Sequence, residues 1–236
     1  MDLFGKALLA FYRGHSDASI KLIRDDGWED DHSPGLYFEP DPFDFERPAL
    51  ALIMGPTIDV GCGAGRHLKW LDPQGHKAFG VDISEGAVEV CHAQGIKAVE
   101  CFDILSDRTP SVPFTPRNIS LFGNNVGIGG TFEGSTTLFQ NLHHLCAEDG
   151  QLVLTGIDVR KTDNAQHIAY QEQNVARGRR RGEITIKVSF EDKVGPNFNW
   201  FHPEPKEIEE LGSLTGWKIE KLERCGNFFW SSLRRS

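Results

Sequence analysis

Three glycines at alternating positions mark the stretch of this chain best suited to bind a ligand. Residues 57–60 predict a short buried strand, and Gly61, Gly63 and Gly65 follow it before a run with helical periodicity. Glycine permits positive φ and carries no Cβ, so a ligand can press against the backbone. The free N–H groups at the start of a helix then face that ligand. The stretch therefore predicts a ligand-binding corner between a strand and a helix.

The spacing of these glycines distinguishes between classes of ligand. A dinucleotide fingerprint is G-x-G-x-x-G, followed by an acidic residue about 20 residues later. Here the third glycine comes one residue early, at Gly65, and Arg66 stands where the fingerprint needs glycine. The pattern G-x-G-x-G argues against a nicotinamide-dependent oxidoreductase.

Glycines or polar residues also follow the later predicted strands. They are Asp82 after residues 77–81, Asp103 after residues 97–101, and residues 123–125 after residues 119–122. Strands that alternate with helices predict a parallel sheet with right-handed crossovers. Ligands bind such sheets beyond the carboxyl ends of the strands, so we expect these residues to meet the glycine stretch at one edge.

The glycine stretch together with Asp82 resembles the first motifs of class I S-adenosylmethionine-dependent methyltransferases. The resemblance covers about residues 56–235, and it has a narrower form. The segments G-C-G-A-G-R-H, V-D-I-S, L-F-G-N-N-V-G and H-I-A-Y-Q-E-Q-N are similar to small bacterial methyltransferases of the type 11/12 kind. The resemblance implies a doubly wound, mostly parallel, seven-stranded Rossmann-like α/β sheet with an antiparallel last strand. It also implies S-adenosylmethionine as cofactor, S-adenosylhomocysteine as product, and no metal.

The same resemblance assigns residues to the cofactor. In this family the glycine loop passes under the methionine part, and the acid that ends the next strand takes both ribose hydroxyls. The residues implied to contact the cofactor are Asp59, Gly61, Cys62, Gly63, Gly65, Asp82, Ile83, Asp103, Ile104, Gly123 and Asn124. Adenine- and glutamine-directed members carry Asp/Asn-Pro-Pro-Tyr at the strand end where this chain has residues 123–125. Its absence argues against methylation of base amines or glutamine amides.

The substrate side is predicted to lie in an insertion over residues 156–202. Residues 165–176 are expected to form a helix. Alternation of apolar and polar residues over 184–190 and 198–202 predicts an antiparallel hairpin outside the parallel sheet. An exposed edge of this hairpin would allow pairing with a second chain, and hence a homodimer.

The insertion and its surroundings supply the candidates for acid–base chemistry. Imidazole can take a proton near neutral pH, so His167 and His202 are candidates for a general base. The predicted substrate contacts are Asn125, Asp158, Tyr170 and Trp200.

Residues 1–47 form a leader ahead of the methyltransferase domain, which spans residues 48–236. The leader begins with an amphipathic helix, and an acidic, proline-rich run over residues 25–42 is expected to be loop-like. Aromatic residues in that run indicate packing on the rest of the chain. Two alternatives stay open: a lid over the cofactor, or a solvated arm with a few docked aromatics.

Composition limits the classes of function. The chain has 236 residues and 39% hydrophobic residues, typical of one globular α/β domain with an appendage. Neither a secretory signal nor a membrane-length apolar run is evident, so we expect a cytoplasmic protein without membrane contact. The five scattered cysteines argue against a disulfide framework and a zinc site. A net charge of −9 makes nucleic acid an improbable partner.

The resemblance, together with the acidic composition, implies an enzyme that transfers a methyl group to a small molecule by in-line displacement. Such an enzyme mainly aligns the nucleophile, methyl carbon and leaving sulfur, and excludes water. One alternative is a methyltransferase acting on RNA or protein, with the arginines of residues 177–181 as a docking patch. Another is a non-catalytic protein that binds S-adenosylmethionine.

Overall fold

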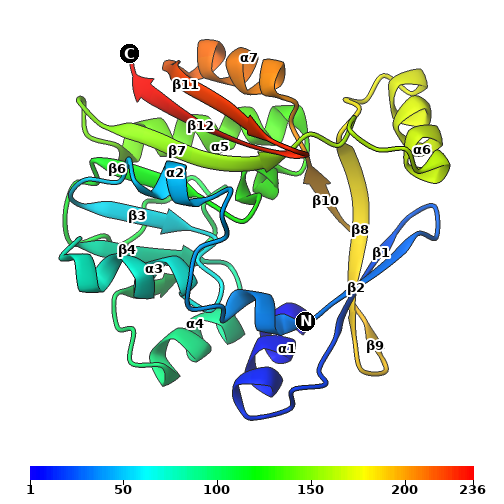
Figure 1. Cartoon of the computed structure of the whole chain (residues 1–236), viewed down its shortest axis with the longest axis horizontal. Helices are drawn as coiled ribbons and strands as arrows, with labels where there is room; N and C mark the ends of the chain where they lie inside the picture. The colour runs from blue at the N-terminus through cyan, green and yellow to red at the C-terminus, as the bar shows by residue number, and fades with distance from the viewer.

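A seven-stranded sheet forms the centre of the protein, which is described here over residues 1–236 from a computed structural model (Figure 1). Its strand order is β11-β12-β7-β6-β3-β4-β5. The strands are β3 (Thr57–Val60), β4 (Ala78–Asp82), β5 (Val99–Cys101), β6 (Asn118–Leu121), β7 (Gln151–Ile157), β11 (Trp217–Cys225) and β12 (Phe228–Arg235). Strand β12 pairs antiparallel with both β7 and β11, while the pairs from β7 to β5 are parallel. The predicted doubly wound, mostly parallel fold with an antiparallel last strand is confirmed.

Helices cover both faces of this sheet. They are α2 (Arg47–Leu50), α3 (Arg66–Leu71), α4 (Glu85–Ala93), α5 (Phe132–Leu145) and α7 (Pro205–Thr215). The hydroxyls of Ser84 and Thr131 cap α4 and α5 by accepting from backbone N–H groups, which satisfies donors that a helix start leaves free. Each helix then buries one apolar stripe against the strands.

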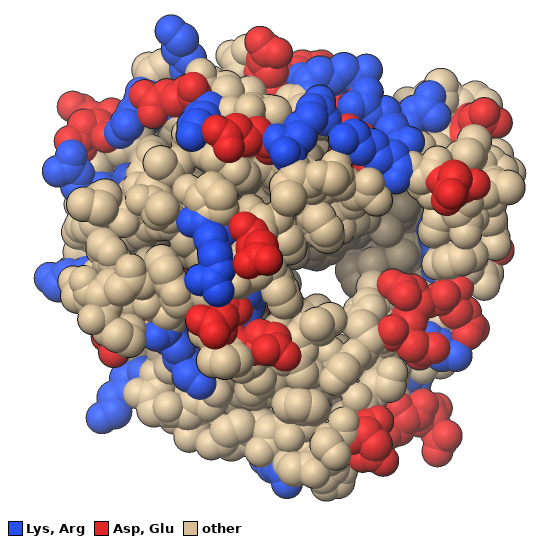
Figure 2. Space-filling model, viewed as in Figure 1, with Lys and Arg blue, Asp and Glu red and all other residues tan.

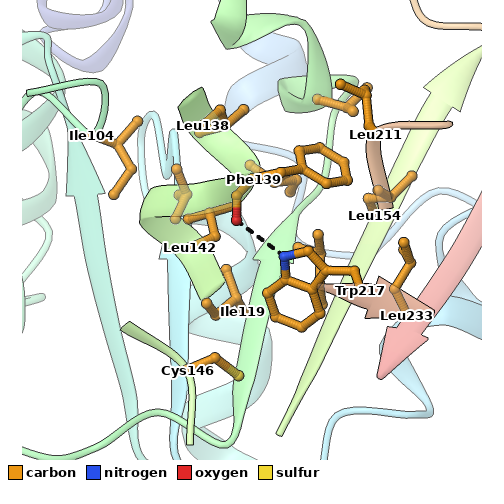
Figure 3. Packing of buried hydrophobic residues seen from close by; sticks show 14 of the residues in the cluster. Ile104, Ile119, Leu138, Phe139, Leu142, Cys146, Leu154, Leu211, Trp217 and Leu233 are labelled. Carbon is orange, nitrogen blue, oxygen red and sulfur yellow. Dashed lines mark hydrogen bonds between the residues drawn. The ribbon is translucent and has the colours of Figure 1, made fainter. Parts of the chain in front are cut away.

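The largest apolar cluster lies between the sheet and helices α5 and α7 (Figure 3). Phe139 and Leu142 lie on the buried face of α5, and they pack with Trp217 at the start of β11. The indole Nε1 of Trp217 donates to the carbonyl of Phe139 at 3.0 Å, so the buried ring leaves no unpaired donor. A second cluster, with Leu50, Leu71 and Trp230, fills the opposite face.

A smaller antiparallel sheet joins the leader to the insertion. Its order is β10-β8-β1-β2, with β9 paired to β8. The strands are β1 (Ile20–Arg24), β2 (Glu29–His32), β8 (Glu183–Phe190), β9 (Lys193–Val194) and β10 (Phe198–Phe201). Figure 1 shows this sheet beside the carboxyl ends of the parallel strands. The leader and the insertion thus form one structure beside the carboxyl ends of the parallel strands.

The second sheet confirms two expectations from the sequence and corrects two others. The β8–β10 hairpin and helix α6 (Ala165–Ala176) form as predicted. The expectation of a loop is wrong for residues 29–32, because β2 pairs with β1 and its acidic side chains stand on an exposed sheet edge. One edge of the hairpin is also not free, because β8 pairs with β1 of the same chain, so that edge offers no place for a second copy.

The rest of the leader packs against the nucleotide-binding half of the fold. Helix α1 (Leu3–Tyr12) lies on α4, where Asp2 Oδ2 accepts from Ser84 Oγ at 2.8 Å and from Gly86 N at 3.0 Å. The short 3-10 helix η1 (Pro34–Tyr37) then leads toward the glycine loop. None of the helices combines the length and hydropathy that a membrane span requires.

Candidate active site

The glycine loop adopts the backbone conformation that its sequence predicts. Gly61, Gly63 and Gly65 have φ of 73°, 55° and 79°, a region that side-chain-bearing residues rarely enter. A Cβ on Gly61 would lie 2.5 Å from Asn125 Nδ2. That amide nitrogen donates to the carbonyls of Val60 at 3.0 Å and Gly61 at 2.6 Å. Asn125, predicted as a substrate contact, therefore holds the loop with its amide N–H groups.

Asp82 joins the end of β4 to this loop. Its Oδ2 accepts from Gly63 N at 2.8 Å, and its Oδ1 accepts from Ser84 N at 2.9 Å. Burial raises the pKa of Asp82, and these backbone donors oppose that rise. Tyr37 of the leader lies close by, because a Cβ on Gly63 would be 3.5 Å from its ring. Burial and the charge of Asp82 raise the pKa of Tyr37 to about 12.

The other residues assigned to the adenosine end differ in exposure. Ile83 is 70% exposed beside Asp82, which leaves its side chain free to cover a ligand. Asp103 Oδ1 accepts from Leu105 N at 2.9 Å and so closes a turn after β5. Ile104 is buried in the main apolar cluster. Asp59 is buried beneath the loop and accepts from Ser120 Oγ at 2.7 Å.

A cavity of about 420 Å³ lies between the glycine loop, the ends of β6 and β7, and the leader. Its lining includes several predicted site residues, namely Gly61, Cys62, Gly63, Gly123, Asn124 and Asn125. The leader contributes Leu36, Tyr37, Phe43, Phe45 and Glu46, and we call the four apolar or aromatic members of this set the roof. Figure 2 shows that the molecule is hollowed between the two sheets on the face in view.

An ion pair that the sequence does not reveal lies at the boundary between roof and loop. Arg66 Nη1 and Nη2 donate to Glu46 Oε2 and Oε1, both at 2.8 Å, and the Glu46 side chain is 0% exposed. His67 Nε2 lies 3.4 Å from Glu46 Oε1, and His67 Nδ1 lies 3.8 Å from Asp59 Oδ2. Burial raises the pKa of Glu46, but its interactions with His67 and Arg66 outweigh that effect and hold the pKa at about 2.

The same groups raise the pKa of His67. Burial lowers this pKa, but interactions with Asp59 and Glu46 exceed that effect. A sequence signal existed for Arg66 and His67, because they directly follow the third glycine at the start of α3. Glu46 had none, since no motif or spacing in the leader marks it.

Aromatic contacts complete the roof. Phe43 N donates to Glu46 Oε2 at 3.0 Å, and the Arg66 guanidinium lies 4.5 Å from the centre of the Phe43 ring. Phe45 stacks on Phe228 of β12, with ring centres 4.1 Å apart and planes 9° apart. The roof is thus attached to both the glycine-loop helix and the antiparallel end of the sheet.

Asn124 connects the cavity to His202. Asn124 Nδ2 lies 3.0 Å from His202 Nδ1. An amide nitrogen can only donate, so Nδ1 accepts and the imidazole is neutral. Burial lowers the pKa of His202 to about 4, which agrees with this state. His202 is not among the residues that line the cavity, and it lies behind Asn124.

The remaining substrate-side candidates lie outside the cavity lining. His167 Nδ1 accepts from Arg24 Nη1 at 3.0 Å, and the Tyr170 hydroxyl donates to Asp25 Oδ1 at 2.7 Å. These contacts hold α6 against the β1–β2 hairpin. Asp158 accepts from Arg160 and Arg224, while the Trp200 indole packs against Gly127. No group of three or more His, Cys, Asp or Glu residues is arranged to hold a metal ion.

Comparison with known proteins agrees with this geometry. Residues 58–122, which run from β3 through the glycine loop to the end of β6, match the family model described as a methyltransferase domain. Over these residues the chain is similar to the methyltransferase-domain family. This match agrees with the expected methyltransferase class, and three solved structures of similar fold contain S-adenosylmethionine or S-adenosylhomocysteine. No functionally curated protein matches the chain.

Solved structures show the same fold along nearly the whole chain. An S-adenosylmethionine-dependent methyltransferase from Bacteroides fragilis, in complex with S-adenosylhomocysteine, is 23% identical with a TM-score of 0.84. That match covers 98% of this chain and 94% of the other. The CcbJ methyltransferase of Streptomyces caelestis is 12% identical, covers 83% and 90%, and has a TM-score of 0.61. The 1,6-didemethyltoxoflavin-N1-methyltransferase of Burkholderia thailandensis is 14% identical, covers 99% and 89%, and has a TM-score of 0.54.

Proposed function

We propose that this protein transfers the methyl group of S-adenosylmethionine to a small molecule held in the cavity under the roof. The observation that carries the proposal is that the glycine loop and the roof line the same cavity. The glycine loop and the end of β6 line the same space of about 420 Å³ as the roof, within the range of small-molecule sites. A neighbour of the same fold was crystallised with 1,6-didemethyltoxoflavin and S-adenosylhomocysteine, which supports a small acceptor.

The residues at the loop fit the cofactor. Gly63 has no Cβ, and the nearest side chain to that position is Tyr37 at 3.5 Å, so the backbone there can take a ligand. An ionised carboxylate has about four lone-pair sites, and backbone donors use two of those on Asp82. The remaining two suit the ribose hydroxyls. The loop and the end of β6 would hold the methionine part.

When bound, the cofactor supplies an electrophilic methyl carbon and a sulfur leaving group. The protein itself aligns the acceptor and keeps out water. Alignment of the reacting groups can supply a large part of the barrier reduction in such displacements. Of the two candidates for a general base, His167 lies outside the cavity lining and His202 contacts Asn124. We assign His202 as a positioning residue that fixes the orientation of the Asn124 amide. We assign His167 no role in the reaction.

The arginine patch gives little support to an RNA acceptor. Arg180 donates to Glu210 at 2.8 Å and stacks on the Phe132 ring at 3.9 Å. Arg179 pairs with the buried Glu183. Paired guanidinium groups offer less charge to a phosphate backbone, and the whole chain carries a net charge of −9.

Calorimetry with S-adenosylhomocysteine tests the cofactor half of the proposal. We expect micromolar binding by the wild-type protein and a loss of at least tenfold in Asp82→Ala. Glu89→Ala serves as the matched control, because this exposed residue of α4 contacts only the exposed Arg13. Folded wild-type protein that fails to bind would refute the proposal. For the acceptor half, a salt-sensitive gel shift with bulk tRNA would favour the RNA alternative.

A further inference from the structure

The ionisable groups that line the cavity neutralise one another. Glu46 and Arg66 satisfy each other through two contacts, with side chains 0% and 7% exposed. His67 lies between the carboxylates of Glu46 and Asp59. The Tyr37 hydroxyl is neutral at physiological pH, and burial raises its pKa further, to about 12. The charged side chains of the lining are therefore already paired, and none of them offers a free charge to an ionic acceptor.

An ionic acceptor would have to break the ion pair to find a partner. An anion would draw Arg66 from Glu46, and a cation would draw Glu46 from Arg66. Each would leave a buried charge unpaired, which is strongly unfavourable. Acidic side chains also gather on the side of the second sheet in Figure 2, which further disfavours an anion.

Most of the apolar lining is aromatic, although Leu36, Cys62 and Ile157 also contribute to it. Phe45 and Phe228 stand nearly parallel, and Phe122 lies on the floor of the cavity beside the loop. Aromatic rings favour offset stacked or edge-on neighbours, and each such contact adds about 0.5–1.5 kcal/mol beyond burial of area. Polar contacts come from the Thr155 hydroxyl and the Asn124 amide, which are enough to orient a ring but not to hold a sugar.

From the neutral ion pair and the aromatic lining together, we infer that the methyl acceptor is an uncharged, planar aromatic compound. This inference rests on the proposed function, because it concerns the acceptor part of the same cavity. It assigns acceptor specificity to Phe45 and Phe228, and it assigns the exclusion of acids to the pairing of Arg66 with Glu46.

Three probes of different chemistry test the inference on protein saturated with S-adenosylhomocysteine. They are 2-naphthol, 2-naphthoate and cyclohexanol, titrated by ligand-observed NMR. We expect the Kd for 2-naphthol to be at least tenfold below that of each other probe. Binding of 2-naphthoate or cyclohexanol as tight as that of 2-naphthol would overturn the inference, as would no binding of 2-naphthol.

Two variants separate the aromatic part of the inference from the charge part. Phe45→Leu should weaken the binding of 2-naphthol about tenfold. Phe198→Leu, at an exposed position of β10 outside the cavity, should leave that binding unchanged. Glu46→Gln leaves Arg66 without its carboxylate, so 2-naphthoate should bind at least tenfold tighter than it binds the wild type. Unchanged affinities in folded Phe45→Leu or folded Glu46→Gln would contradict the inference. If Glu46→Gln does not fold, Phe45→Leu and the wild-type probe ranking still decide.

Failure of the inference about the acceptor can be distinguished from failure of the proposed function. Binding of S-adenosylhomocysteine is measured separately on each protein. Wild-type protein that binds this product but not 2-naphthol refutes the acceptor class alone. Wild-type protein that does not bind the product refutes the function itself.

Discussion

Glu46 and Arg66 form a buried ion pair with two N···O contacts of 2.8 Å, and this pair ties the leader to the helix that follows the glycine loop. Glu46 also accepts from the backbone N–H of Phe43, so one carboxylate holds both the roof and the loop. The position of the cavity wall therefore depends on the same group that neutralises Arg66.

Removal of one partner of this pair should strongly destabilise the fold. Arg66→Met leaves the Glu46 carboxylate buried without its main partner, and we expect a loss of about 3–5 kcal/mol in the free energy of unfolding. Urea denaturation measures this loss. Arg47→Met is the control, because Arg47 is half exposed and 3.5 Å from the exposed Asp44, so it should change stability by less than about 1 kcal/mol. Equal effects of the two substitutions would show that the buried pair has no special role.

Gly61→Ala should impair cofactor binding through contact as well as strain. Gly61 has φ of 73°, and an added Cβ would lie 2.5 Å from Asn125 Nδ2, so the loop or the asparagine must move. Gly75→Ala is a matched control, with φ of 76° and nothing within 4 Å of the added Cβ. Both should lose about 1–2 kcal/mol of stability from left-handed backbone. Calorimetry should show at least tenfold weaker binding of S-adenosylhomocysteine in Gly61→Ala alone. Similar affinities in the two variants would argue against this account of the loop.

The free energy of unfolding should decrease as the pH is lowered, because His202 is buried in its neutral form. Its folded-state pKa of about 4 lies below the unfolded value of about 6.5, so the unfolded chain takes up a proton first. The contribution is fully present above pH 6.5 and is lost progressively toward pH 4, to a total of about 3 kcal/mol. Urea denaturation at pH 7 and pH 5 should show a smaller difference for His202→Gln than for the wild type. The glutamine amide retains a hydrogen-bonding group near Asn124. An unchanged difference would mean that His202 titrates normally in the folded protein.

Thiol reactivity should follow burial. Cys101 and Cys225 are exposed, whereas Cys62, Cys91 and Cys146 are buried. Burial raises the pKa of Cys146 to about 11, and the pKa of Cys62 is raised by hydrogen bonding to Cys91 together with burial. Ellman's reagent should therefore modify Cys101 and Cys225 in the native protein and all five thiols in urea. Rapid native modification of Cys62 would contradict the closed packing around the glycine loop.

Local patterns in the sequence were sufficient for the parallel half of the molecule. Glycines at 61, 63 and 65 require positive φ, and Asp82 follows a short apolar strand, so the corner and its acidic partner could be predicted from neighbouring residues. Helix α6 likewise forms over residues 165–176 as predicted, and it carries His167 and Tyr170 three residues apart. Both conclusions depend on geometry within one or two elements.

The other side of the cavity was decided by contacts between residues far apart in the chain. Periodicity states which side chains share a face but not what that face will meet, and the face with His167 and Tyr170 packs on Arg24 and Asp25 instead of the cavity. Phe45 reaches Phe228 across most of the chain length. An acidic run that resembles a solvated loop contains strand β2, because β1 offers it backbone partners. The sequence alone determined the glycine corner through backbone conformation, whereas long-range strand pairing and one buried ion pair determined the opposite wall of the cavity.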